Sequence, residues 1–397
     1  MFGRREGRSR KGTAKAHEGE VSLVDSGAQE SEGEGAPFEE DDLIREERRK
    51  ILLIKSRRSL ILVVMVIAII LVMGYGFTVG SSSMSASTAY KILINQLFDG
   101  IFPGLFGEFS ANQIFIVMDL RAPRVLVAAL IGAILSIGGC IVQSILKNPL
   151  ATPYTLGVSS GACVGASLYY IFGITLISGT AGLITNAFIF SLIPIAAMMF
   201  ALTHRTVSPV TLVLSGVAFS YVFSSLNSIM QYFGDTTAVA DVVFWTIGDL
   251  TSASMWMVPV LAVALVIYLA YGIYFGKDMD IMRMGEDTAA SLGINTKFIT
   301  ASALILACFM TALCVACAGP IGFVCLLSPH ICRRLVGSEL RWLIPTSACF
   351  GALLLLVADM IAKTVVSPLM LPVGAITALL GAPVMVYMLY SKKGMSA

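Results

Sequence analysis

Charged side chains are scarce in this sequence. Asp, Glu, Lys and Arg make up 13% of the 397 residues, whereas soluble domains carry about 25%. Four stretches contain none of these residues and no histidine: 125–146, 154–203, 250–276 and 364–391. Such a composition excludes an ordinary soluble domain and is typical of a protein within a lipid bilayer. It also disfavours an ion-coupled carrier, which would keep ionisable groups inside the membrane for transport.

Signatures of on-chain catalysis, nucleotide binding and metal binding are also missing. No G-x-x-x-x-G-K-[ST] motif occurs, so the chain has no phosphate-binding loop of its own. Cys314 and Cys317 form a CxxC pattern without a second pair or a nearby histidine at zinc-ligand spacing. The eight cysteines lie in or beside apolar runs, which predicts reduced packing residues. We therefore expect no catalytic residue, no metal site and no cofactor on this chain, and no membrane-embedded enzyme.

Apolar runs fill most of the sequence after residue 59. A helix needs about 20 mostly apolar residues to cross roughly 30 Å of hydrocarbon. Ten runs come near this length: 60–79, 125–146, 156–177, 186–203, 210–230, 253–275, 298–318, 320–334, 343–362 and 373–390. The sequence therefore predicts an all-α polytopic membrane protein with about ten transmembrane helices.

The charged residues predict the domain organisation and the orientation. Residues 1–58 are predicted to be a charged tail that is disordered to about Asp42, and the run 41–59 at its end suits either a juxtamembrane helix or a solvated linker. Residues 59–393 form the predicted transmembrane domain, and 394–397 are a short C-terminal tail. The first apolar run starts near Leu60, so we expect no secretory signal in this sequence. Lysine and arginine gather in alternate connections, which predicts that both termini are cytoplasmic.

Several connections have recognisable chemistry. Segments 88–109 and 235–250 predict short interfacial helices on the outer side. Gly157, Gly161 and Gly165 form GxxxGxxxG, which favours close helix packing over a pore-lining role. Residues 147–153, KNPLATP, cannot continue a helix, because Pro149 and Pro153 lack backbone donors. That turn either connects two spans or narrows a pore mouth.

The connection at 276–297 is the longest polar one after the first span and is expected to face the cytosol. Within it, 287–292 predicts a short helix that begins beside acidic residues and ends at Gly293. The segment is either a solvated loop or a helix that inserts into a soluble motor. Asp359 and Lys363 are one turn apart and predict a mutual ion pair. His330 is expected to be an interfacial packing residue.

Four ordered motifs carry a family resemblance that spans about residues 60–393. They are LRAPRVLVAALIGAILSIGGCIVQSILKNPLATPYTLGVSSGA at 120–162, LVLSGVAFS at 212–220, GEDTAASLGIN followed by AGPIGFVCLLSPHICRRLVG, and LPVGAITALLGAPVMVYML. The sequence resembles the FecCD-type permeases, which import iron siderophores, haem and cobalamin with an ATP-binding cassette (ABC) partner. The resemblance implies a type II ABC importer permease fold with ten helices per subunit.

The resemblance also implies roles for particular residues. The residues expected to couple to the ATPase are Gly285, Glu286, Asp287, Ala289, Ala290, Leu292 and Gly293. Arg121, Arg124 and Lys363 would dock the binding protein, although the family has arginine at the position of Lys363. Asn148, Pro149 and Leu150 would form a cytoplasmic gate, with a second contribution near Pro209 and Val210.

The function expected from these features is ATP-driven import of a ferric siderophore by alternating access at the plasma membrane. The implied partners are a second copy of the chain or a paralogous permease, two cytoplasmic ATPases that use ATP and Mg²⁺, an extracellular binding protein and membrane lipid, with no nucleic acid. Haem and cobalamin are alternative cargoes of the same family. An ion-coupled secondary transporter is the rival from another class.

Overall fold

A computed structural model describes residues 37–80, 84–98, 106–204 and 209–390 of the chain, and every regular element in these ranges is helical. The helices are α1 (Pro37–Thr78), α2 (Ala86–Phe98), α3 (Ala111–Phe115), η1 (Ile116–Arg121), α4 (Ala122–Ile145), η2 (Pro153–Leu156), α5 (Val158–Phe172), α6 (Thr180–His204), α7 (Pro209–Phe233), α8 (Thr236–Ile247), α9 (Met257–Met284), α10 (Glu286–Ser291), α11 (Thr296–Ala318), α12 (Val324–Val336), α13 (Leu340–Thr364) and α14 (Val373–Tyr390). The predicted all-α class is confirmed for the described residues.

Seven helices of the described chain are long and apolar enough to cross a membrane. They include α1, α6, α7, α9, α11 and α13, together with the continuous run Ala111–Ile145 that joins α3, η1 and α4. Each of the ten predicted spans coincides with a helix, but α5, α12 and α14 are not among these seven. The number of crossings therefore stays a prediction.

Helix α1 is a single helix of 42 residues that carries both the charged juxtamembrane segment and the first predicted span. Its sequence contains no proline after Pro37 and no glycine before Gly74, so nothing interrupts the backbone hydrogen bonds between these positions. The chain divides into two compact units at Leu53 and Ile54. Within the first unit, Glu46 and Lys50 form an exposed ion pair one turn apart. Most of the predicted disordered tail, and the C-terminal tail, lie outside the described residues.

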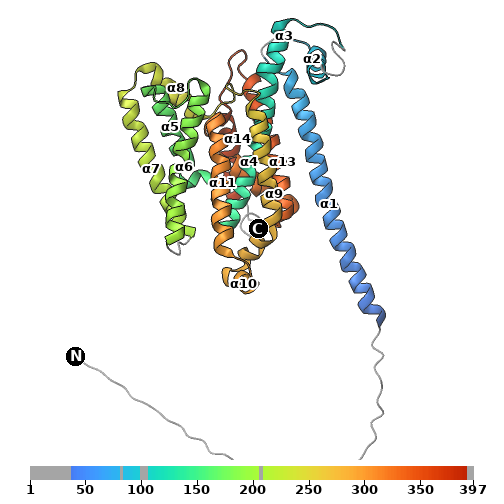
Figure 1. Cartoon of the computed structure of the whole chain (residues 1–397). Helices are drawn as coiled ribbons and strands as arrows, with labels where there is room; N and C mark the ends of the chain where they lie inside the picture. Colours follow the sequence, from blue (N-terminus) through green and yellow to red (C-terminus); the bar gives the residue numbers. More distant parts are fainter. Residues whose placement is uncertain (1–36, 81–83, 99–105, 205–208, 391–397) are drawn as a thin grey trace, which may run out of the picture. The chain divides into compact units, whose positions relative to one another are not determined.

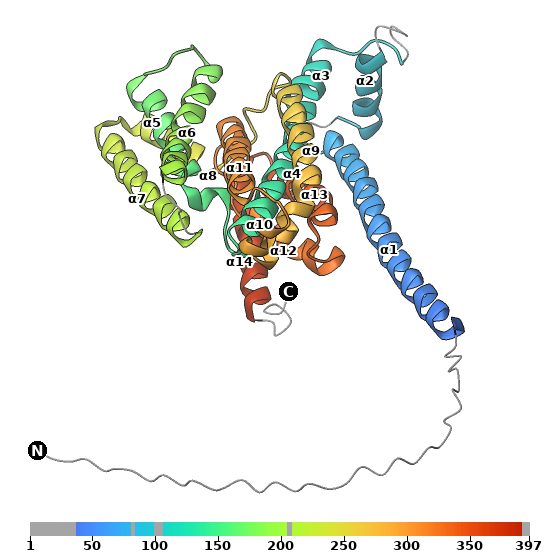
Figure 2. The ribbon, with the colours of Figure 1, turned by 60° about the horizontal axis from the view of Figure 1, so that its bottom comes forward.

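Helix α4 forms the centre of one group of helices and packs against α9, α11, α12 and α13 (Figures 1 and 2). Almost all of its side chains are buried, and small residues let neighbouring backbones come close. A Cβ at Gly132 would lie 2.3 Å from the carbonyl oxygen of Gly351, and a Cβ at Gly139 would overlap the carbonyl oxygen of Cys325. The backbones of α13 and α12 therefore lie directly against α4.

A second group contains α5, α6, α7 and α8 (Figure 1). A Cβ at Gly161 would lie 2.5 Å from the carbonyl oxygen of Phe190 in α6, and a Cβ at Gly165 would lie 2.4 Å from that of Asn186. These two glycines pack helices together, as the GxxxGxxxG pattern predicts. Gly157 lies before α5 instead, with a φ of 90°, and serves the turn between η2 and α5. Only glycine adopts that conformation without strain.

The short helices also follow the sequence. Helix α8 lies within the predicted segment 235–250, and Asp235 caps it by accepting a hydrogen bond from the amide of Ala238. Helix α2 overlaps only the first half of the other predicted segment, 88–109. Helix α10 coincides with the short helix predicted at 287–292. Local signals at the start and end of the helix were therefore sufficient to place α10.

Candidate functional site

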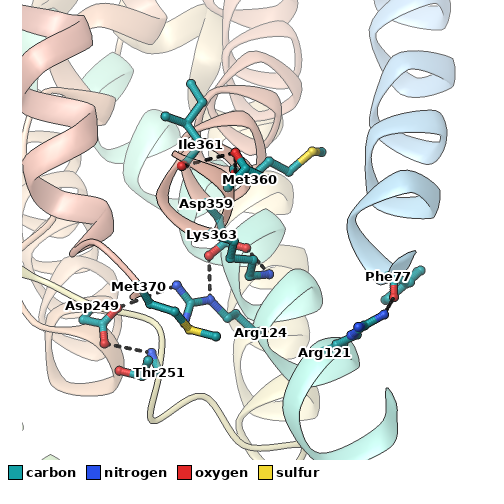
Figure 3. A network of polar contacts seen from close by, with 11 residues as sticks. Phe77, Arg121, Arg124, Asp249, Thr251, Asp359, Met360, Ile361, Lys363 and Met370 are labelled. Carbon is teal, nitrogen blue, oxygen red and sulfur yellow. Dashed lines mark hydrogen bonds and ion pairs between the residues drawn. The ribbon is translucent and has the colours of Figure 1, made fainter. Parts of the chain in front are cut away.

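A buried group of charges joins α4, α13 and the loop after α8 (Figure 3). Arg124 Nε donates to Asp359 Oδ1 over 2.6 Å, and Lys363 Nζ lies 2.5 Å from Asp359 Oδ2. Asp249 contributes a second carboxylate, 3.8 Å from the Arg124 guanidinium. The predicted pair of Asp359 and Lys363 is confirmed, but no sequence pattern predicted that Arg124 and Asp249 would join it.

The charges in this group balance, which explains how they are tolerated at the end of apolar helices. Two cations face two carboxylates, and Arg124, Lys363 and Asp359 are respectively 4%, 6% and 1% exposed. A buried charge needs a partner of opposite sign. Arg124 has an ion pair and a hydrogen bond to Asp359, whereas Lys363 Nζ has the ion pair without a hydrogen bond among the described residues. Asp249 is the most exposed side chain of the four, at 29%. The group is thus held inside the chain and reaches the surface through Asp249.

Arg121 makes a different set of contacts. Its Nη1 donates to the carbonyl oxygens of Phe77 and Thr78, over 3.2 Å and 3.0 Å, at the end of α1 (Figure 3). The last carbonyls of a helix lack intrahelical donors and carry partial negative charge, so a guanidinium is a suitable partner. Arg121 therefore ties α1 to η1. Both arginines predicted to face outward are buried in this structure.

The turn after α4 is held by its own hydrogen bonds. Asn148 Oδ1 accepts from the amide of Leu150 over 2.9 Å, and the Asn148 carbonyl accepts from Ala151 over 3.1 Å. Lys147 enters the turn with a φ of 48°. Leu150 is 48% exposed, so an apolar side chain projects from a rigid turn. Val210 at the start of α7 is also exposed, and the Pro209 side chain lies outside the described ones.

Helix α10 presents one buried residue and several exposed ones. Ala289 is fully buried against the core that includes Met279 and Met282 of α9, whereas Leu292 is 64% exposed. Glu286 and Asp287 occupy the first turn, where negative charge is favourable. Gly293, with a φ of 83°, and Ile294 donate back to Ala290 and Ala289, which ends the helix. Ala289 thus anchors a small exposed helix to α9.

Other predicted features can be placed but gain no role. Within the described residues, no group of three or more His, Cys, Asp and Glu could hold a metal ion. Cys314 and Cys317 are buried in α11, and His330 lies on α12 beside Arg333 and Arg334.

Comparison with known proteins gives the family. The model of the FecCD transport family matches residues 56–391. The chain belongs to this family. FecCD relatives include the Fe(3+) dicitrate permease protein FecD of Escherichia coli, which is 36% identical over 69% of this chain and 85% of its own. The hemin permease protein HmuU of Yersinia pestis is 31% identical over 82% of this chain and 95% of its own.

A solved structure supports the FecCD fold. It is described as an inward-facing conformation of an ABC transporter of the metal-chelate type, and its chain has a TM-score of 0.71 and 26% identity. The match covers 83% of this chain and 98% of that one. The FecCD family is one of ABC transporter permeases, so the expected class of protein is confirmed.

Proposed function

We propose that this chain is the transmembrane subunit of an ATP-driven importer that carries a ferric siderophore into the cytoplasm. The observation that carries the proposal is the FecCD match over residues 56–391. Among the relatives, permeases named for ferric dicitrate, ferric hydroxamate and siderophores recur. Iron is cargo here, bound in its chelate. Hemin is the second candidate cargo, because HmuU aligns with 82% of this chain; cobalamin is a third.

The proposed topology has ten crossings, with both termini in the cytoplasm and the chain in the plasma membrane. Ten helices lie at the ten predicted spans, and lysine and arginine gather in the connections that would then face the cytoplasm. Two copies of the chain, or this chain and a paralogous permease, would enclose the path of the chelate. Residues 1–58 would remain a cytoplasmic tail before the permease domain at 59–393.

The proposed mechanism is alternating access driven by two partner ATPases that use ATP and Mg²⁺. The connection 276–297 would reach the ATPases through α10, with Leu292 and the acidic first turn as the exposed contact. Asn148, Pro149 and Leu150 would close the path at the same end of the bundle. Charge-free spans offer the chelate apolar walls, so affinity would come from the extracellular binding protein.

The binding protein would dock at the outer end through Arg121, Arg124 and Lys363. These cations are internally paired in this structure, so acidic groups of the binding protein would compete with Asp359 and with the α1 carbonyls. Such competition is physically reasonable, because a carboxylate on the partner can replace one inside the chain at little net cost. Asp249, which is partly exposed, marks where this exchange would begin.

The cargo is tested by uptake into vesicles that contain the chain, its ATPases and its binding protein. Radiolabelled ferric siderophore should accumulate when ATP is present, and unlabelled siderophore should compete for this uptake. Labelled hemin and cobalamin are the matched controls and should stay outside. Accumulation of hemin or cobalamin in place of the siderophore would correct the cargo, and exclusion of all three would contradict the proposal.

A further inference from the structure

The loop between α12 and α13 is held by two side chains at the end of α9. Asp280 Oδ2 accepts from the amide of Leu340 over 2.9 Å. Arg283 Nη1 donates to the carbonyl oxygen of Ser338 over 2.8 Å and lies 3.4 Å from Asp280 Oδ1. Asp280 and Arg283 lie only a few residues before α10, which begins at Glu286. The segment that carries α10 is therefore bonded directly to the start of α13.

The same loop continues into α12, which is bonded to α4. Arg333 Nη2, one turn before the loop, donates to Gln143 Oε1 over 2.7 Å. Gln143 is 3% exposed, and its Nε2 has no hydrogen-bond partner among the described residues. Arg333 is thus the side-chain contact that holds this buried amide.

Gln143 in turn reaches the turn after α4. Its backbone carbonyl oxygen accepts from the amide of Asn148 over 3.2 Å. Helices α4 and α12 also pack closely. Gly139 of α4 lies against the carbonyl oxygen of Cys325 of α12, with no room for a Cβ. Close-packed backbones transmit a displacement, because there are no compressible side chains between them to absorb it.

We propose that this series of contacts transmits movement of α10 to the turn at 148–150, with Arg333 and Gln143 as the positioning residues. The steps are α10 to the end of α9, then the 337–339 loop, α12, and finally Gln143 and Asn148. The inference rests on the proposed function, since α10 and the turn have transport roles only there. Arg333 and Gln143 are bonded to each other, and each acts through the position of the turn.

The test measures chelate molecules imported per ATP hydrolysed in reconstituted vesicles. Arg333→Met and Gln143→Met each remove one partner while keeping a similar volume. Each should lower the ratio by between about twofold and thirtyfold, the range of coupling changes along such networks. The double variant should lose no more than either single variant, because the two residues share one interaction.

Two variants separate positioning from folding. Gln143→Glu keeps an acceptor for Arg333 and turns the hydrogen bond into an ion pair, so the ratio should stay at the wild-type value or rise. Arg334→Met removes the exposed neighbour on the same helix and should leave the ratio unchanged. The thermal unfolding midpoint of every variant is measured in parallel.

The outcomes of this test and of the proposed function are distinguishable. Absence of ATP-driven uptake by the wild-type complex would overturn the proposed function itself. Suppose instead that the wild type imports the chelate. The transmission route alone is overturned if Arg333→Met and Gln143→Met keep the wild-type ratio of chelate imported to ATP hydrolysed, or if their effects on that ratio add in the double variant.

Discussion

At the scale of single residues, Asp359 forms ion pairs with two buried cations, Arg124 and Lys363. Asp359→Asn would leave Arg124 and Lys363 buried without a carboxylate between them. Removing one partner of a buried pair costs about 3–5 kcal/mol, so this variant should unfold at a clearly lower temperature. Lys363→Met is the matched control and should cost less, because the pair of Arg124 and Asp359 remains.

The buried cysteines supply the measurement for this prediction. Six of the eight, including Cys140, Cys308 and Cys314, are buried in the folded chain. A thiol-reactive fluorescent dye therefore reports unfolding when heat exposes them. If Lys363→Met lowered the unfolding temperature as much as Asp359→Asn, the prediction that Asp359 stabilises both Arg124 and Lys363 would be wrong.

Lys363 also offers a test of docking that does not break the charged group. Lys363→Arg keeps the charge and adds a planar fork that can bind a carboxylate with two hydrogen bonds. We expect about a fivefold lower concentration of binding protein for half-maximal stimulation of ATP hydrolysis, which corresponds to about 1 kcal/mol. Lys91→Arg, at an exposed position of α2, is the control. An unchanged concentration for Lys363→Arg would argue against docking at this position.

At the scale of elements, α10 combines a buried anchor with an exposed contact. Leu292→Asp changes only the exposed surface, so it should abolish stimulation of ATP hydrolysis while leaving the unfolding temperature unchanged. Ala289→Asp places a charge against α9 and should lower the unfolding temperature as well. Measuring both quantities for both variants separates contact from anchoring. Normal stimulation in Leu292→Asp would show that α10 is not the coupling element.

The contact between α5 and α6 depends on the missing Cβ of Gly165. In Gly165→Ala the new Cβ would lie 2.4 Å from the carbonyl oxygen of Asn186, so the helices must separate. Overpacking of this kind costs about 1–3 kcal/mol, and the dye assay should detect it. Gly322→Ala has open space and no left-handed backbone, so it should be nearly neutral. Equal effects of the two substitutions would contradict the packing role.

The elements themselves were the most predictable feature of the chain. Long apolar runs predict α4, α9, α11 and α13, because a span must bury its backbone polar groups in its own helix. Gly293 and the acidic start predicted α10, since capping is a local effect. The continuity of α1 was missed, because the change in composition near residue 59 suggests a boundary that the backbone does not have.

The contacts inside the candidate sites were less predictable. Asp359 and Lys363 could be paired from their spacing, but Arg124 and Asp359 are 235 positions apart, and Gln143 and Arg333 are 190 apart. Sequence alone does not give the rotation and height of one helix against another, which decide such pairs. Arg121 and Arg124 were therefore predicted to face outward, although both side chains are buried in this structure.

At the scale of the whole molecule, the sequence keeps Asp, Glu, Lys, Arg and His out of four long stretches: 125–146, 154–203, 250–276 and 364–391. The charges of Arg124, Asp249, Asp359 and Lys363 balance and form ion pairs with one another. Membership of the FecCD family supports the proposal that the energy source lies outside the chain. The central claim is therefore that partner ATPases, and not an ion gradient, drive import.

The most direct measurement compares uptake of labelled chelate by vesicles with and without the ATPase subunits. The chain and the binding protein are present in both preparations, and an ionophore removes all ion gradients. The account predicts accumulation in the complete vesicles with ATP, unaffected by the ionophore, and none without the ATPases. Accumulation without the ATPases that stops when the ionophore is added would contradict it.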